Sequence, residues 1–260
     1  MHPFLADAPA PRVLAHRGFV PPDADGIVEN TLAAFAAAHA AGAAYVESDC
    51  HLTADGVVVL FHDGDLSRVT GDPRQIAAVT HAELVRIMAD RGGVLSVREA
   101  LDAFPTLRFN LDVKAERAAL PLGRAVAPQA HRVLLTSFSD ARRRAAMDAA
   151  ERAGGKPATS GGQATVGRAV AAAATGSGAL VRRALHGIDA LQVPERVGAL
   201  RIATPRFVRA AHAAGVEVHV WTVNDEIAME RLLDIGVDGL VTDRTDIALE
   251  AVARRRRSVA

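Results

Sequence analysis

Short runs rich in branched and aliphatic residues alternate with alanine-rich stretches of helical length along most of the chain. Nine runs have the length and composition of strands, at residues 13–16, 45–51, 57–61, 108–113, 133–137, 157–160, 188–193, 216–223 and 239–242. Helix-length segments lie between most of them, for example at 32–41, 140–152, 205–214 and 226–235. This alternation predicts a parallel sheet with crossover helices. About eight such units in 260 residues match an α/β fold of the TIM (β/α)8 barrel type, which is the fold we predict.

The second and third runs are an exception, because they lie too close together for a parallel crossover connection. We therefore expect an antiparallel β-hairpin, in which 57–61 extends the second barrel strand over the barrel mouth. Asp55-Gly56 predicts a two-residue type I′ turn. That turn would pair Asp49 with His62. The polar stretch that follows, 71–96, is interpreted as a small excursion from a single domain spanning 1–260, with an ordered core at about 11–253.

Composition narrows the classes of function. Half of the residues are apolar and the formal net charge is zero, so no overall field favours nucleic acid or an anionic membrane. Cys50 is the single cysteine, which excludes an intrachain disulfide. The N-terminal residues lack a signal-peptide pattern, and no apolar run approaches the ~20 residues that span a bilayer. We expect a cytoplasmic protein without a nucleic-acid partner or stable membrane insertion, and a homo-oligomer is left open.

The C-terminal run Arg254–Arg257 is the strongest local concentration of charge. We interpret it as a solvated tail, with contact to a phosphate or lipid as the alternative.

Two carboxylates stand two residues apart in the run 45–51. Period-two alternation places Glu47 and Asp49 on the same face of a strand, and the apolar residues before them indicate burial. Burial and mutual repulsion disfavour their charged forms, so a neutralising partner is expected. Because the donors are oxygens, magnesium or calcium is one interpretation. Neutralisation by His51 or by an arginine is the other.

The run 108–113 repeats this arrangement. Asn110, Asp112 and Lys114 share one face of the predicted strand. Asp112 is a candidate third metal ligand, and Lys114 is a candidate contact for an anion. A simple ion pair between Asp112 and Lys114 remains the alternative.

Candidate acid–base groups fall at predicted strand ends, which in a TIM barrel point into the active site. His16 ends the first strand and is followed by Arg17 and Gly18, and His62 ends the hairpin. Imidazole exchanges protons near neutral pH, although a structural role is the alternative for each histidine. Trp221 ends a late strand, where it is either an aromatic wall of the mouth or part of the core.

Glu29-Asn30-Thr31 precedes the helical segment 32–41. We expect Asn30 and Thr31 to cap this helix, because short polar side chains accept hydrogen bonds from its first free amides. Glu29 is a candidate partner for Arg17.

Taken in order along the chain, these segments resemble the glycerophosphodiester phosphodiesterase family. The matching segments cover nearly the whole chain, at 15–18, 29–35, 47–49, 52–56, 61–63, 66–70, 109–114, 191–194, 219–224 and 236–243. The segment 154–178 matches loosely, and Asp112 stands where many members carry glutamate.

The resemblance implies a TIM barrel with one divalent cation, Mg²⁺ or Ca²⁺, held by Glu47, Asp49 and Asp112. It implies proton transfer by His16 and His62, in either order. It further implies substrate or phosphate contacts from Arg17, Lys114, Trp221, Gln192 and Glu29. The implied reaction is hydrolysis of a small-molecule glycerophosphodiester to sn-glycerol 3-phosphate and an alcohol of unspecified head group.

Two other functions are left open. One is a related barrel phosphodiesterase that acts as a lysophospholipase D or on phosphoinositides. The other is a non-catalytic barrel that binds phosphorylated ligands.

Overall fold

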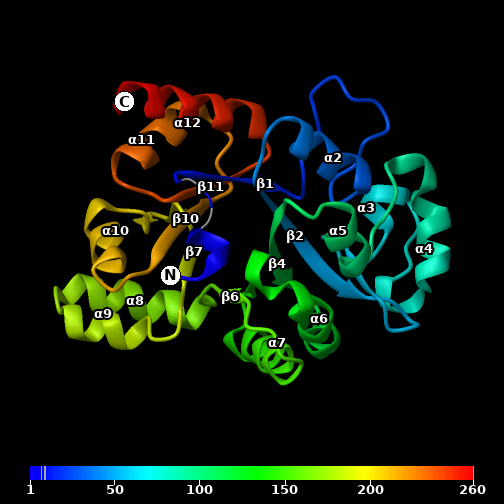
Figure 1. The fold of residues 1–260 in the computed structure, drawn as a ribbon, viewed down its shortest axis with the longest axis horizontal. Coiled ribbons are helices and arrows are strands. Elements are labelled where there is room, and N and C mark those ends of the chain that lie inside the picture. Colours follow the sequence, from blue (N-terminus) through cyan, green and yellow to red (C-terminus); the bar gives the residue numbers. More distant parts are fainter. Residues whose placement is uncertain (7, 9, 260) are drawn as a thin grey trace.

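The computed structural model describes residues 1–6, 8 and 10–259, and these form an eight-stranded parallel barrel with helices between the strands (Figure 1). The hydrogen-bonded strand order is β6 (Ala158–Thr159), β5 (Val133–Thr136), β4 (Arg108–Val113), β2 (Tyr45–Leu52), β1 (Arg12–His16), β11 (Gly239–Thr242), β10 (Glu217–Trp221) and β7 (Ala190–Pro194). A parallel bridge between Ser160 and Ala190 joins the two ends of this series. The predicted TIM barrel is confirmed.

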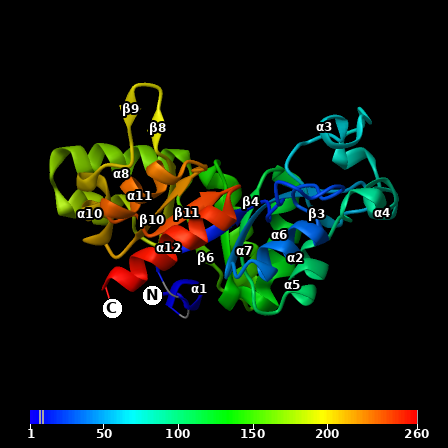
Figure 2. The ribbon, with the colours of Figure 1, turned by 90° about the horizontal axis from the view of Figure 1, so that it is seen from above.

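Helices surround the barrel and connect its strands (Figures 1 and 2). The α-helices are α1 (Pro3–Ala6), α2 (Leu32–Ala40), α3 (Ser67–Thr70), α4 (His81–Met88), α5 (Val97–Ala103), α6 (Ala119–Val126), α7 (Asp140–Arg152), α8 (Gln163–Thr175), α9 (Gly178–Ala184), α10 (Pro205–His212), α11 (Glu226–Asp234) and α12 (Thr245–Val259). Short 3-10 helices are η1 (Ile76–Ala78), η2 (Ala89–Arg91), η3 (Glu116–Ala118) and η4 (Ala127–Arg132). Within the described residues, no helix is long and apolar enough to cross a membrane.

A buried ion pair lies at the amino-terminal end of the barrel strands. Arg12 at the start of β1 donates two hydrogen bonds to the Glu217 carboxylate at the start of β10, at 2.8 and 2.7 Å. The same guanidinium donates to the Leu5 carbonyl and the Tyr45 hydroxyl. Phe4 of helix α1 packs edge-to-face on Tyr45, with ring centroids 5.1 Å apart. Helix α1 therefore packs at this end of the barrel, and Arg12 is hydrogen-bonded to it.

The predicted antiparallel pairing of the second and third runs is present, because β3 (Val58–Leu60) pairs with β2. Its predicted register is wrong by one residue: Cys50 is opposite Leu60, and the amide of Phe61, not His62, bonds the Asp49 carbonyl. The loop has three residues, with a turn closed from the Gly56 amide to the Thr53 carbonyl. Gly56 alone takes a left-handed φ, of 81°, whereas a type I′ turn needs two such residues.

Replacing Gly56 with alanine is expected to destabilise the protein by about 1 kcal/mol. A Cβ there would meet nothing within 4 Å of it among the described atoms, so the cost comes from the positive φ alone. Urea unfolding followed by circular dichroism would measure the loss. Gly167→Ala, in a right-handed helical position, is a suitable comparison, and equal stability of the Gly56 variant and the parent would contradict the turn assignment.

The segment 71–96 leaves the barrel after the hairpin and carries η1, α4 and η2. It encloses a small apolar cluster of its own, in which Ile76, Leu84 and Met88 pack against Val59 and Phe61 of the hairpin arm. Helix α4 begins with a capping box between Thr80 and Glu83.

The C-terminal arginine run is not a free tail. Arg254 lies in helix α12 and pairs with Glu226 and Glu230 of α11, at 2.5 and 3.0 Å. Arg255 pairs with Asp234 at 2.6 Å. The three acidic residues are spaced four positions apart on α11, so they lie along one face of that helix, and Arg254 and Arg255 join the last two helices through them.

Candidate active site

A cavity of about 700 Å³ opens at the carboxyl ends of the barrel strands. Nine of the ten predicted site residues line it: His16, Arg17, Glu47, Asp49, His62, Asp112, Lys114, Gln192 and Trp221. Glu29 lies behind this lining and contacts it through Arg17, whose Nη1 donates to Glu29 Oε1 at 2.9 Å. The strand ends thus bring together residues that are up to about two hundred positions apart in the sequence.

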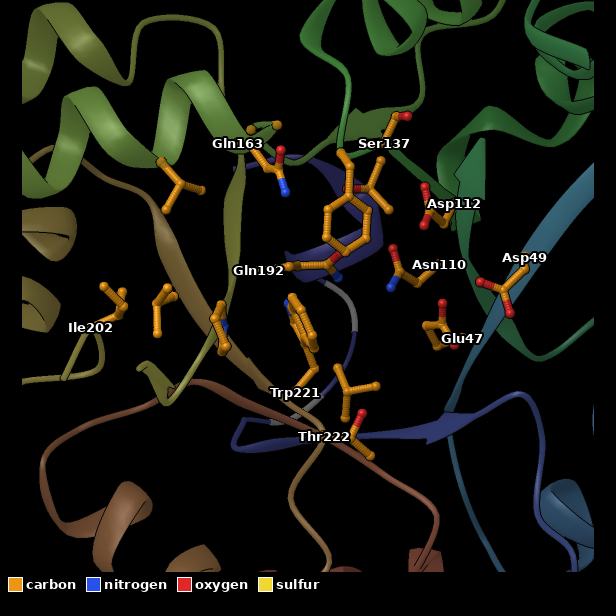
Figure 3. Close-up of a pocket in the computed structure, with 18 of the residues that line it drawn as sticks. Glu47, Asp49, Asn110, Asp112, Ser137, Gln163, Gln192, Ile202, Trp221 and Thr222 are labelled. Carbon is orange, nitrogen blue, oxygen red and sulfur yellow. The ribbon is translucent and has the colours of Figure 1, made fainter. Parts of the chain in front are cut away.

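Strand register explains how the polar groups meet. His16 is level with Glu47 across β1 and β2, and Asp49 is level with Asp112 across β2 and β4. Because alternate side chains of a strand share a face, Glu47 and Asp49 both point into the cavity, as does Asp112. Figure 3 shows the three carboxylates grouped at one side of the cavity.

Each candidate histidine is held by an aspartate. His16 Nδ1 lies 2.6 Å from Asp243 Oδ1, and His62 Nδ1 lies 2.7 Å from Asp63 Oδ1. A carboxylate at Nδ1 fixes the tautomer and leaves Nε2 as the nitrogen for proton exchange. His16 Nε2 points toward Glu47, whose Oε2 is 3.8 Å away.

The surroundings of His16 raise its pKa. Burial acts to lower it, but the hydrogen bond that His16 donates to Asp243, together with the nearby Glu47 carboxylate, outweighs that effect. The Asp63 carboxylate shows the complementary change: burial acts to raise its pKa, and bonds from His62 and Arg68 lower it overall. Both aspartates that hold the histidines therefore stay ionised, since the pKa of Asp243 is lowered as well.

Lys114 neutralises two of the three carboxylates. Its Nζ lies 2.9 Å from Asp49 Oδ1 and 2.7 Å from Asp112 Oδ2. Arg17 adds a contact, with Nε 3.4 Å from Asp49 Oδ2. Of the two neutralising partners considered from the sequence, an arginine thus contacts Asp49, whereas His51 instead faces the carbonyl of His62.

Among the described residues, His16 is the only basic side chain within 4 Å of the Glu47 carboxylate, at 3.8 Å. Burial, followed by repulsion from Asp49, raises the pKa of Glu47 to about 8. In the part of the chain that the structure describes, Glu47 Oε2, Asp112 Oδ1 and Asn110 Oδ1 have no hydrogen-bond partner. Buried acceptors of this kind are costly unless they are satisfied.

These unsatisfied oxygens fit a hard divalent cation, which takes carboxylate and amide ligands. As the side chains stand, no three His, Cys, Asp or Glu residues of the described chain surround a common point suited to a metal ion. The ammonium group of Lys114 lies between two of the carboxylates, Asp49 and Asp112. The donor set is compatible with a cation, and Lys114 competes with it.

Arg17, directly after β1, and Asn30, just before α2, both have left-handed φ values, of 58° and 60°, and the Asn30 amide donates to the Arg17 carbonyl. Such values are uncommon for residues other than glycine and often occur at functional sites. Gly18 follows with a φ of 86°, and a Cβ there would lie 2.8 Å from Ala34 Cβ of helix α2. The close approach requires glycine.

The capping prediction is correct for Thr31 and wrong for Asn30. Thr31 is the N-cap of α2 and accepts from the Ala34 amide. Asn30 is buried beneath the carboxylates, where its Oδ1 accepts from Ser48 Oγ at 2.6 Å and its Nδ2 faces Asp49 Oδ2 at 3.4 Å. A left-handed backbone turns the Asn30 side chain inward instead of along the helix.

Arg68 is a site residue to which the sequence analysis gave no role. It bonds Asp63, the partner of His62, at 2.6 Å and Glu29, the partner of Arg17, at 2.5 Å. Asp63 was also missed, although its position next to His62 was an available signal. Asp243 and Asn224, which bond each other at 2.6 Å, come from the ends of β11 and β10, and only the fold reveals their proximity to His16.

Trp221 is half-buried at the cavity wall and packs edge-to-face on Phe138, with ring centroids 5.7 Å apart. Figure 3 places Trp221 and Gln192 in the middle of the cavity, between the carboxylates and Ile202. The aromatic-wall interpretation of Trp221 thus fits its position better than a place in the core.

The fold and the position of the cavity define the class first: this is a TIM barrel whose cavity lies at the carboxyl ends of the strands, where TIM-barrel enzymes have their active sites. The model of the glycerophosphoryl diester phosphodiesterase family matches residues 16–247. The chain belongs to this family and is a phosphoric diester hydrolase.

Individual relatives agree with this assignment. The chain is 34% identical to "Probable glycerophosphodiester phosphodiesterase 2" of Mycobacterium tuberculosis over 245 residues, which cover 93% of this chain and 90% of that protein. It resembles the crystal structure of a glycerophosphodiester phosphodiesterase from Thermotoga maritima, with a TM-score of 0.67, 25% identity, and coverage of 93% and 97% of the two chains. An Oleispira antarctica phosphodiesterase solved with the product sn-glycerol-3-phosphate shares the fold, at 24% identity, a TM-score of 0.69 and coverage of 94% and 97%. Enzymes of this family generally use a divalent metal.

Proposed function

We propose that this enzyme hydrolyses glycerophosphodiesters to sn-glycerol 3-phosphate and an alcohol with the help of a divalent cation, and that His16 and His62 transfer the protons. The observation that carries the proposal is the pair of aspartate-held imidazoles in the cavity that also contains the carboxylates, Arg17 and Lys114. Two proton-exchanging groups beside a site for an anion are what cleavage of a phosphodiester requires.

In this proposal each side chain has a separate task. Arg17 and Lys114 offset charge on the phosphoryl oxygens as it develops. One histidine removes a proton from the attacking hydroxyl, and the other protonates the leaving alkoxide. Asp63 and Asp243 hold the two rings in orientation, while Trp221 and Gln192 contact the remainder of the substrate.

Glu47, Asp49 and Asp112 would hold the cation, which when bound would polarise the phosphoryl group. The unsatisfied oxygens of Glu47 and Asp112 support this assignment. Magnesium and calcium both suit an all-oxygen donor set.

Chelation is expected to abolish hydrolysis of glycerophosphocholine, and added Mg²⁺ or Ca²⁺ should restore it. Glu47→Gln should weaken metal binding, measured by calorimetry, by at least about tenfold, since even residues that only support metal ligands contribute ~10–100-fold. Glu116→Gln, at an exposed glutamate, is the matched control and should bind metal like the parent.

Release of glycerol 3-phosphate and choline would be assayed in the same samples. Full activity in chelator would contradict the role of the cation. The absence of any metal-stimulated hydrolysis across a panel of glycerophosphodiesters would instead favour a barrel that only binds phosphorylated ligands.

A further inference from the structure

The cavity extends well beyond the polar groups that the reaction needs. Figure 3 shows Glu47, Asp49 and Asp112 at one side and Ile202 at the opposite side, with Trp221 between them. The cavity lining also includes the apolar side chains Val166, Val170, Val197 and Leu200, which the reaction does not use. The whole cavity is continuous, at about 700 Å³, a volume that ordinarily holds a ligand much larger than glycerol phosphate.

Helix α8 forms one wall of this apolar part of the cavity. The residues that it contributes are spaced by three or four positions and therefore lie on one helix face: Gln163, Val166, Gly167, Val170 and Ala171. The face runs from a polar residue at the helix start to small and branched apolar residues further along. We call this face of α8 the track, and it extends from Gln163 away from the carboxylates (Figure 3).

Gly167 is the notable member of this face. It lies in the interior of α8, where glycine is unfavourable relative to alanine. Its φ is not positive, and among the described atoms nothing lies within 4 Å of the position that a Cβ would take. Neither backbone conformation nor packing therefore requires glycine here, whereas a ligand lying against the helix would.

The opposite wall is a small hairpin of β8 (Arg196–Val197) and β9 (Leu200–Arg201), which projects from the barrel (Figure 2). Val197 and Leu200 line the cavity, yet 60% and 59% of their surfaces are exposed. Adjacent exposed apolar side chains at the edge of a cavity are typical of a binding surface for an apolar group.

We propose that the substrate of this enzyme carries a long acyl or alkyl chain, which lies along the Gly167 face of α8 and leaves the cavity beside Val197 and Leu200. The inference rests on the proposed function and specifies its substrate class. The reaction itself is unchanged: the bond between phosphorus and the leaving alcohol breaks, a bond to a hydroxyl oxygen forms, and the alkoxide receives a proton.

The hydrocarbon chain of the substrate can be attached at either of two places. It is attached to the glycerol, as in a lysophospholipid, or it is the leaving alcohol itself. Hydrolysis of a lysophospholipid would release lysophosphatidic acid and the head-group alcohol, whereas hydrolysis of a glycerophosphoalkanol would release glycerol 3-phosphate and the long-chain alcohol.

The test compares kcat/KM for glycerophosphocholine with two series of increasing chain length, lysophosphatidylcholines and glycerophosphoalkanols, all below their micellar concentrations. We expect kcat/KM in one series to rise on the order of tenfold for every two methylenes buried. The series that shows the rise identifies the source of the chain. Hydrolysis of glycerophosphocholine with no dependence on chain length in either series would overturn this inference and leave the proposed function standing. The absence of hydrolysis of every substrate would overturn both.

Gly167→Leu provides the structural test, because its side chain would occupy the track. We expect the ratio of long-chain to short-chain kcat/KM to fall by at least tenfold, with thermal stability equal to or above that of the parent. Ala174→Leu, at an exposed position further along α8 and outside the cavity lining, should keep the parent ratio. An unchanged ratio in a folded Gly167→Leu enzyme would overturn the proposed path of the chain.

Discussion

Replacing His16 or His62 with alanine is expected to lower kcat by about 10²–10⁴-fold, the contribution typical of a positioned acid or base. Each imidazole lines the cavity, and each is held through Nδ1 by an ionised aspartate. Neither ring belongs to the apolar core, so both variants should remain folded. Steady-state kinetics with glycerophosphocholine, together with circular dichroism, would measure the two effects.

The pH profile gives a second, independent measurement for the same variants. If one histidine acts as base and the other as acid, kcat/KM of the parent enzyme should rise and then fall with pH. Because the pKa of His16 is raised, its protonated form persists to a higher pH than that of an ordinary histidine. Each alanine variant should lose one limb of the profile.

His186→Ala is the matched control, since His186 is exposed and is not among the residues that line the cavity. It should keep both the turnover and the pH profile of the parent. Near-normal turnover of either His16→Ala or His62→Ala would remove that residue from the proposed mechanism.

Glu217→Gln is expected to reduce the free energy of unfolding at pH 7 by about 3–5 kcal/mol, because it leaves the buried Arg12 guanidinium without its counter-charge. Arg12 is 3% exposed, so water cannot replace the lost carboxylate. Burial acts to raise the pKa of Glu217, but the bonds from Arg12 and His219 lower it to about 2.

The lowered pKa also fixes the sign of the pH dependence. Glu217 binds a proton more readily in the unfolded chain, whose carboxyl has the ordinary pKa of 4.5. Its contribution to stability is therefore present above pH 4.5 and lost as the pH falls from 4.5 toward 2. Urea unfolding at pH 7, 4 and 3 should show that the free energy of unfolding falls less with decreasing pH in Glu217→Gln than in the parent.

Glu250→Gln, at an exposed position of helix α12, controls for removal of one negative charge and should unfold like the parent. Equal stability of Glu217→Gln and the parent at pH 7 would contradict the structural role of the ion pair.

The main features of this fold could be predicted because they depend on local sequence. Alternation of strand-like and helix-like runs indicated the barrel, and helix α7 (Asp140–Arg152) has the predicted bounds. Period-two spacing was sufficient to place Glu47 and Asp49 on one strand face. The hairpin register was wrong because Asp-Gly fits both two-residue and three-residue loops, and the choice depends on the φ of Asp55, which the sequence does not reveal.

The remaining site features depend on contacts between distant segments. The sequence suggests that Asn30 is a helix cap, because it does not reveal that Asn30 itself has a left-handed φ, of 60°. The contact between His16 and Asp243 joins the ends of the first and last strands along the chain, β1 and β11, which are neighbours in the sheet although they lie more than two hundred residues apart in the sequence. The apolar part of the cavity likewise could not be predicted, since α8 and the β8–β9 hairpin carry no recognisable motif.

Arg68 has a consequence for how the enzyme responds to change. It lies in α3, outside the barrel, and holds both the aspartate behind His62 and the glutamate behind Arg17. A single side chain outside the barrel therefore supports both His62, the proposed proton-transfer group, and Arg17, the proposed phosphate-binding group, through their acidic partners. A displacement of α3 would alter turnover and substrate affinity together, so these two properties are mechanically linked although the groups responsible for them come from different strands.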